Sequence, residues 1–297
     1  MTVSIRPVHP HFVGEVEGID MRRPLTQDEV AAIEAGMDQY AVLVFHGQDV
    51  TDEQQAAFSR NFGDLEIPGA SSNVTKPEDR RLRTAEIADI SNLDKNNNPL
   101  GRDDRQRMFN LGNQLWHSDS SFKATPAKYS LLSARIVPSA GGNTEFADMR
   151  AAYDALDDAT KADLEDLICE HSLIYSRGQL GFTEMSVAEK ANFKPVQQRL
   201  VRTHPVTGRK SLFLSSHIGT ILGWPIPEAR ALIRDLIEHA TQREFVYAHK
   251  WQQYDLVMWD NRQTMHRARR FRDTAEKRDM RRTTVAGDAP TVQQVAA

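Results

Sequence analysis

The 297-residue chain contains a single cysteine, Cys169, and no run of apolar residues long enough to cross a membrane. One cysteine cannot form an internal disulfide or build a thiolate zinc cluster. A membrane-spanning helix needs about 20 apolar residues, and residues 1–7 also lack the apolar stretch of a secretory signal peptide. These absences favour a reducing compartment, and we expect the protein in the cytoplasm.

A strong charge of either sign is also lacking, because 37 Lys and Arg face 41 Asp and Glu for a formal net charge of −4. With 26% charged and 40% apolar residues, the composition is that of an ordinary globular protein and excludes a globally basic nucleic-acid-binding surface. A chain of this length can bury a sizeable core. Since no repeat or linker divides it, we expect one domain over residues 1–297.

Strand patterns outnumber helix patterns. Thr26 with Glu29, and Thr51 with Gln54, have the spacing of a capping box at the start of a helix. We expect helices over 26–40, 51–63, 148–156, 158–170 and 225–242. We expect extended segments over 1–20, 41–45, 128–137, 143–147, 171–176, 201–214, 244–250, 255–259, 265–269 and 280–285. Many strands with peripheral helices predict a mainly β fold of the jelly-roll type, a double sheet.

Polar stretches interrupt this pattern. Between 65 and 83 Gly, Pro, Ser, Asn and charged residues dominate, as is typical of an active-site lid or a disordered segment. Lys76 in this stretch is a candidate ligand for a substrate carboxylate, the alternative being a solvated lysine. We expect 92–104 to be plain surface and 177–197 an irregular insert.

Three residues form a candidate metal site. On an extended segment His117 and Asp119 point to the same side. His266 follows the predicted strand 255–259 and the turn-prone pair Asp260–Asn261. Two histidines and one carboxylate leave open positions on a metal, as in non-haem Fe(II) oxygenases. Spacing alone leaves equally open that these are unrelated residues whose imidazoles are satisfied by hydrogen bonds.

Four motifs carry a family resemblance, and they lie at 42–45, 113–122, 141–150 and 259–282. In composition and order they resemble the Fe(II)- and 2-oxoglutarate-dependent dioxygenases of the taurine dioxygenase family. Within that family the chain is most similar to the bacterial 2,4-dichlorophenoxyacetate dioxygenases. The resemblance implies a distorted double-stranded β-helix with helices outside it, and Fe(II) bound by His117, Asp119 and His266.

The resemblance also implies roles for residues around the iron. Thr144 and Arg278 match the residues that bind a carboxylate of 2-oxoglutarate, a bidentate task that suits arginine. Arg282 matches a ligand of the substrate's anionic group, the alternative being a surface ion pair. His217 and His204 are further candidates for the substrate pocket, with hydrogen-bonded structural histidines as the alternative.

A basic run follows His266 and consists of Arg267, Arg269, Arg270, Arg272, Lys277, Arg278, Arg281 and Arg282. Taken alone, it predicts a nucleic-acid-binding patch. If 265–269 and 280–285 are strands, however, alternation turns some guanidinium groups inward, where each requires an anionic partner such as 2-oxoglutarate. A non-enzymatic β-barrel binding module with a basic tail is therefore the alternative to an enzyme.

The reaction implied by the resemblance consumes 2-oxoglutarate and O2. An aryloxyacetate would be hydroxylated at the methylene between its ether oxygen and its carboxylate, and would yield a phenol and glyoxylate beside succinate and CO2. The alternative substrates are taurine or another small sulfonate or carboxylate. We expect a small-molecule aryloxy acid as the partner, with no nucleic acid and no membrane, and leave a homo-oligomer open.

Overall fold

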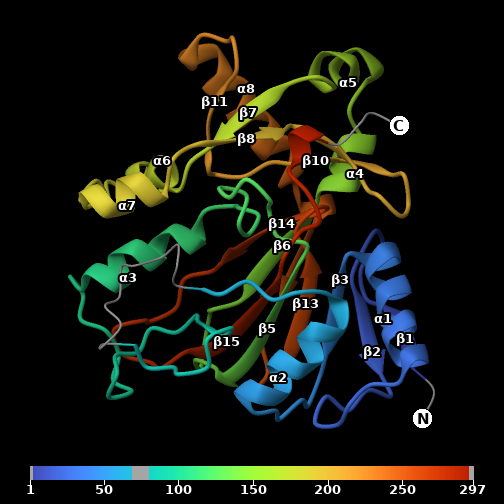
Figure 1. The fold of residues 1–297 in the computed structure, drawn as a ribbon, viewed down its shortest axis with the longest axis vertical. Helices are drawn as coiled ribbons and strands as arrows, with labels where there is room; N and C mark the ends of the chain where they lie inside the picture. The colour runs from blue at the N-terminus through green and yellow to red at the C-terminus, as the bar shows by residue number, and fades with distance from the viewer. Residues whose placement is uncertain (1–2, 69–79, 294–297) are drawn as a thin grey trace.

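A computed structural model of the chain describes residues 3–68 and 80–293 and shows a sheet-rich fold with helices on its outside (Figure 1). The largest sheet has seven strands, in the spatial order β1 Ser4–Pro7, β2 Gly14–Glu17, β3 Val42–Phe45, β13 Leu256–Asp260, β5 Tyr129–Ile136, β15 Asp279–Val285 and β4 Ala88–Asp89. A three-stranded sheet has the order β12 Val246–His249, β6 Thr144–Asp148 and β14 Thr264–Ala268. The pairs are antiparallel apart from β2 with β3.

Smaller strands and most of the later helices gather at one end of the molecule (Figure 1). The strands there are β11 Ile218–Ile221, β7 Ile168–His171, β8 Val196–Arg199, β9 Val201–Thr203 and β10 Lys210–Leu212. Over the described residues as a whole, the helices are α1 Gln27–Tyr40, α2 Asp52–Ser59, α3 Arg105–Asn110, α4 Met149–Asp154, α5 Asp158–Leu164, α6 Leu173–Gly178, α7 Val187–Asn192 and α8 Ile226–Ala240. Short 3-10 helices are η1 Arg60–Phe62, η3 Leu111–Gln114, η4 Arg243–Phe245 and η5 Thr291–Gln293. Within residues 3–68 and 80–293, no helix combines the length and apolar character needed to span a membrane.

Alternation along the central strands builds two apolar layers, because successive residues of a strand point to opposite faces. Phe45 shares an apolar cluster with Ile33 of α1, on the helix-covered face of the large sheet. Its neighbour Val44 belongs to a second cluster with Phe146 of β6 and Trp259 of β13. The large sheet therefore packs against helices on one face and against the three-stranded sheet on the other.

The predicted capping boxes are confirmed at both N-terminal helices. At α1 the Thr26 hydroxyl accepts from the backbone N–H of Glu29 at 3.2 Å, and the Glu29 carboxylate accepts from Thr26 N–H at 2.8 Å. Thr51 and Gln54 repeat this arrangement at α2. Each pair satisfies two N–H groups that a helix start leaves without partners.

Three predictions between 158 and 197 are wrong in part. The expected helix over 158–170 ends at Leu164, since the chain continues as β7 between β8 and β11, pairings that no local pattern contains. The expected extended segment 171–176 is interrupted by α6, where the Ser172 hydroxyl accepts from Tyr175 N–H at 3.2 Å. The irregular insert contains α7, which Ser186 caps.

Replacement of the α1 cap gives a direct test of this local account. Thr26→Ala removes the side-chain acceptor, and we expect it to lower the free energy of unfolding by about 1 kcal/mol. Thr26→Ser keeps the hydroxyl and is expected to stay close to the parent. Urea unfolding measures both variants, and equal stability of Thr26→Ala and the parent would contradict the role of the cap.

Candidate metal centre

The site begins at a backbone pairing between two distant histidines. The N–H of His117 donates to the carbonyl of His266 at 3.0 Å, and the N–H of His266 donates back at 2.8 Å. His266 lies in the middle of β14. On the other side of this strand it is paired with Phe146 of β6. The pairing brings the two imidazoles side by side, with ring centroids 4.2 Å apart and the ring planes tilted by 45°.

Asp119 reaches the same place because the chain turns directly after it, with Ser120 at a φ of 56°. The N–H of Asp119 donates to Asn261 Oδ1 at 3.0 Å, and the Ser130 hydroxyl donates to Asp119 Oδ2 at 2.7 Å. Asn261 also donates to Ser130 Oγ at 2.9 Å, so the three side chains support one another. This network fixes the direction in which the carboxylate points.

One ligand atom from each of His117, Asp119 and His266 lies within 4.8 Å of the other two, and all three side chains are buried. Nε2 of His117 is 3.9 Å from Asp119 Oδ1, and Nε2 of His266 is 3.8 Å from Asp119 Oδ2. Ligand atoms about 2.1 Å from one metal ion lie within about 4 Å of each other. The three side chains therefore fit a single metal ion. Among residues 3–68 and 80–293, they are the one cluster of three or more His, Cys, Asp or Glu side chains close enough to share an ion.

Protonation of the triad also suits a metal. His117 Nδ1 lies 2.7 Å from the Leu115 carbonyl, which only accepts, so Nδ1 carries the proton and Nε2 keeps its lone pair. Burial lowers the pKa of both His117 and His266, which favours neutral imidazoles. Burial alone would raise the pKa of Asp119, but the Arg282 guanidinium and the hydrogen bond from Ser130 act against burial, and the pKa is lowered.

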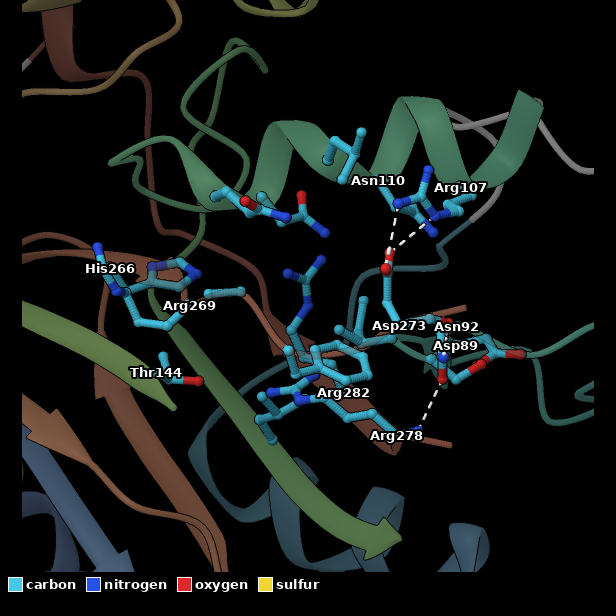
Figure 2. A pocket seen from close by; sticks show the side chains of 18 of the residues that line it. Asp89, Asn92, Arg107, Asn110, Thr144, His266, Arg269, Asp273, Arg278 and Arg282 are labelled. Atoms are coloured by element: carbon cyan, nitrogen blue, oxygen red, sulfur yellow. Dashed lines mark hydrogen bonds and ion pairs between the residues drawn. The ribbon is translucent and has the colours of Figure 1, made fainter. Parts of the chain in front are cut away.

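Two cavities meet at this triad, and His117 and Arg282 line both. Thr144, Arg278 and His266 line the first, which is drawn in Figure 2. The second is lined on its polar side by Asp119, Arg177 and His217 and on its apolar side by Phe109, Phe122 and Leu173. The predicted 2-oxoglutarate residues therefore lie on one side of His117, and the predicted pocket histidine His217 lies on the other.

Arg278 is 6% exposed, and its guanidinium makes no hydrogen bond or ion pair with any residue that the structure describes. Burial lowers its pKa to about 10. Gly142 lies beside it in a left-handed conformation with a φ of 70°, and a Cβ there would meet Pro138 at 2.9 Å. The Thr144 hydroxyl accepts from Trp251 Nε1 at 3.0 Å, which leaves its own proton for another acceptor.

Arg282 forms an ion pair inside the site, so the alternative of a surface ion pair is wrong. Its Nη1 donates to Asp119 Oδ1 at 2.6 Å, while its Nε is buried without a hydrogen-bond partner among the described residues. Arg267 pairs with Glu145 at 2.7 Å and Arg281 pairs with Asp279. The basic run is thus divided: Arg267, Arg281 and Arg282 are in ion pairs and Arg278 lines the first cavity, whereas Arg270, Arg272 and Lys277 are exposed.

The remaining candidate substrate residues are His217, His204 and Lys76. The His217 ring lies 6.1 Å from that of His117, and its Nδ1 is 2.8 Å from Ser176 Oγ. His204 lines neither cavity and lies beside Asp260, with 3.4 Å between Nε2 and Oδ2. Lys76, with residues 69–79 of the predicted lid, lies outside the described residues.

The expectation that 92–104 is plain surface is wrong at Asn92, a functional-site residue that sequence reasoning missed. Its side chain is buried and donates to the carbonyls of Asp273 and Glu276 at 2.5 and 2.8 Å. It also accepts from the N–H of Arg278 at 2.8 Å (Figure 2). Asn92 therefore holds the loop that presents Arg278, and a single Asn in a polar loop gives no sequence signal for this role.

Comparisons with known proteins agree over almost the whole chain. Residues 4–284 match the family described as taurine catabolism dioxygenase TauD, TfdA family. The alpha-ketoglutarate-dependent 2,4-dichlorophenoxyacetate dioxygenase of Cupriavidus pinatubonensis is 49% identical over 289 residues, 97% of this chain and 99% of that protein. The (S)-phenoxypropionate/alpha-ketoglutarate-dioxygenase of Sphingobium herbicidovorans is 40% identical over 291 residues, 96% of this chain and 95% of that protein.

A solved structure is also similar to this chain over almost its whole length. The crystal structure of AAD-2 in complex with Mn(II) and N-oxalylglycine matches this fold with a TM-score of 0.95 and 64% sequence identity. The match covers 98% of this chain and 100% of that chain.

Removal of one imidazole tests the triad. Loss of an outer-shell partner of a metal ligand costs about 10- to 100-fold in metal affinity, and we expect His117→Ala, which removes a ligand itself, to cost more than about 100-fold. Anaerobic titration with Mn(II), followed by electron paramagnetic resonance, measures the affinity. The exposed His11→Ala is the control, and an unchanged affinity of His117→Ala would exclude this site.

Proposed function

Because the chain belongs to the TauD, TfdA family of taurine catabolism dioxygenases, we propose that it hydroxylates the side chain of an aryloxyacetate such as 2,4-dichlorophenoxyacetate. The reaction class is that of an Fe(II)- and 2-oxoglutarate-dependent dioxygenase, which uses O2 as the oxidant. One substrate, one 2-oxoglutarate and one O2 become a phenol, glyoxylate, succinate and CO2. The observation that carries the substrate class is the 49% identity to a 2,4-dichlorophenoxyacetate dioxygenase across 97% of this chain.

We assign the iron to His117, Asp119 and His266. The bound metal supplies the redox chemistry of co-substrate decarboxylation and C–H oxidation. The chain's contribution is to hold its three ligand atoms on one side of the ion, so that positions stay open for co-substrate and O2. The Leu115 carbonyl orients His117, and the Ser130 hydroxyl orients Asp119, which supports a site organised before the metal binds.

We assign Arg278 and Thr144 to a carboxylate of 2-oxoglutarate. Support comes from the buried guanidinium of Arg278, which lacks an acidic partner among the described residues, and from the Thr144 proton that remains available for donation. A buried cation is stable only when an anion compensates it. N-oxalylglycine, the ligand in the AAD-2 structure, has an NH in place of one CH2 of 2-oxoglutarate and the same two carboxylates.

We assign Arg282, His217 and Lys76 to the organic substrate. Nε of Arg282 has no described partner, so it can donate to a substrate carboxylate while Nη1 stays on Asp119. Burial lowers the pKa of His217 well below its usual value, and a neutral imidazole 5.0 Å from the Phe122 ring suits an aryl group. Lys76 rests on the family resemblance alone.

The same proposal includes the finer description of the fold, a distorted double-stranded β-helix in one domain. Face-to-face packing of the large sheet against β12-β6-β14 supports it, because Phe146 and Trp259 share one apolar cluster between the two sheets. The candidate metal site lies where β14 meets the segment around His117 and beside this cluster, since the His266 ring is 4.7 Å from that of Trp259 and 6.2 Å from that of Phe146.

Turnover tests the substrate class. With Fe(II), 2-oxoglutarate and O2, we expect 2,4-dichlorophenoxyacetate to give equimolar succinate, glyoxylate and 2,4-dichlorophenol, measured by chromatography. Omission of iron or 2-oxoglutarate, or the substitution His117→Ala, should stop the reaction. Succinate formation driven by taurine and not by the aryloxyacetate would reject the proposed substrate and keep the reaction class.

Arg278→Gln tests the co-substrate assignment separately. Loss of a charge-assisted pair with a carboxylate costs about 1.5–3 kcal/mol, and we expect the KM for 2-oxoglutarate to rise about 10- to 100-fold. The exposed Arg272→Gln is the matched control and is expected to keep the parent value. An unchanged KM in Arg278→Gln would show that another residue binds the co-substrate.

A further inference from the structure

Arg177 is a buried arginine in the cavity on the His217 side of the triad. It comes from the end of α6 and is 5% exposed. Its guanidinium carbon lies 4.5 Å from the centre of the Phe109 ring. The side chain lines the same cavity as His117 and His217, so it lies beside the candidate metal site and on the side away from Arg278.

Among the buried arginines of the described chain, Arg177 lacks an acidic partner, as do Arg202 and Arg278, and of these three Arg177 and Arg278 line the cavities at the triad. Arg150 pairs with Asp148 at 2.9 Å, and Arg262 pairs with Asp260 at 2.7 Å. Among the described residues, Arg177 donates only two long hydrogen bonds, 3.4 Å each, to Asn113 Oδ1 and to the Ser176 hydroxyl, and its Nε has no hydrogen-bond partner. Burial lowers its pKa to about 10.

The guanidinium of Arg177 lies against Gly112 of the neighbouring 3-10 helix η3. A Cβ on Gly112 would lie 2.2 Å from both Cζ and Nη1 of Arg177, a separation that atoms cannot adopt. Gly112 has no positive φ, so its backbone conformation does not require glycine. The missing side chain at Gly112 therefore makes room for Arg177.

We propose that Arg177 binds the carboxylate of the organic substrate, an inference that rests on the proposed function. The reaction brings two carboxylate-bearing molecules to the metal. Arg278 lies with Thr144 in the pocket on the proposed co-substrate side (Figure 2). The Arg282 guanidinium is already shared with Asp119. Arg177 supplies a full guanidinium fork on the other side of His117, and such a fork matches a carboxylate.

The surroundings of Arg177 also specify the rest of the ligand. Phe109, Phe122 and Leu173 line the same cavity and offer apolar surface to an aryl ring. A carboxylate on Arg177 with an aromatic group against these side chains describes an aryloxy acid. A small sulfonate such as taurine carries only two methylene groups and has no aryl ring to fill that space.

Arg177→Met keeps an unbranched, flexible side chain, shorter than that of arginine, and removes the charge. In the enzyme loaded with Fe(II) and 2-oxoglutarate under anaerobic conditions, we expect 2,4-dichlorophenoxyacetate to bind at least about 10-fold more weakly by calorimetry, as loss of a charged hydrogen bond implies. The affinity for 2-oxoglutarate should not change. The neutral amide of the same acid should bind the variant and the parent equally, so that only the preference for the acid is lost.

Thermal unfolding separates this role from a structural one. Removal of a buried cation that lacks a partner should leave the Tm of the unliganded protein equal or higher. A lower Tm, with loss of acid and amide binding together, would overturn the proposal, and so would unchanged binding of the acid. Gly112→Ala, which displaces the guanidinium and keeps its charge, should weaken acid binding in the same direction.

Arg230→Met is the matched control, because Arg230 also lies over an aromatic ring, 4.8 Å from Tyr175, but is exposed and lines neither cavity of the site. It should bind the acid as the parent does. If the parent converts the acid and Arg177→Met binds it equally well, only the role of Arg177 fails. If the parent neither binds nor converts any aryloxyacetate, the proposed function fails and this inference with it.

Discussion

Two backbone hydrogen bonds between His117 and His266 are the constraint on which the site depends. They join residues far apart in sequence and set the separation of the two imidazoles at 4.2 Å. Once this pairing is made, the turn at Ser120 brings Asp119 within reach, and the Ser130 hydroxyl aims its carboxylate. The fold places β14 so that its free edge is available for this pairing, and the ligand set follows from it.

The electrostatic balance around the triad follows from the same placement. Arg282 is shared with Asp119, whereas Arg177 and Arg278 are buried without an acidic partner in the described chain. Such groups cost folding free energy, and proteins retain this kind of cost where a ligand later compensates it. The two guanidiniums lie in different cavities on either side of His117, which matches a reaction that binds two different carboxylates.

Local sequence signals predicted the parts of this structure that local forces decide. The capping boxes at Thr26 and Thr51 form as their spacing indicates, since the partners lie three residues apart. The strands β13, β14 and β15 are near their expected bounds because their apolar runs are continuous or alternate. The prediction failed where tertiary pairing decided, as in β7, which lies between two strands distant in sequence.

The sequence by itself determined the residue types of the site and the family, because motifs are properties of short segments. Strand alternation predicted only that some guanidiniums of the basic run turn inward, and the roles of Arg278 and Arg282 were predicted from the family resemblance. Only the tertiary structure decided which buried cations lack a partner, that Asn92 supports the Arg278 loop, and that His204 lies away from the cavities. The physical reason is that burial and pairing depend on side chains brought together from distant segments. The residues next to it in sequence do not determine which distant side chains a residue will contact.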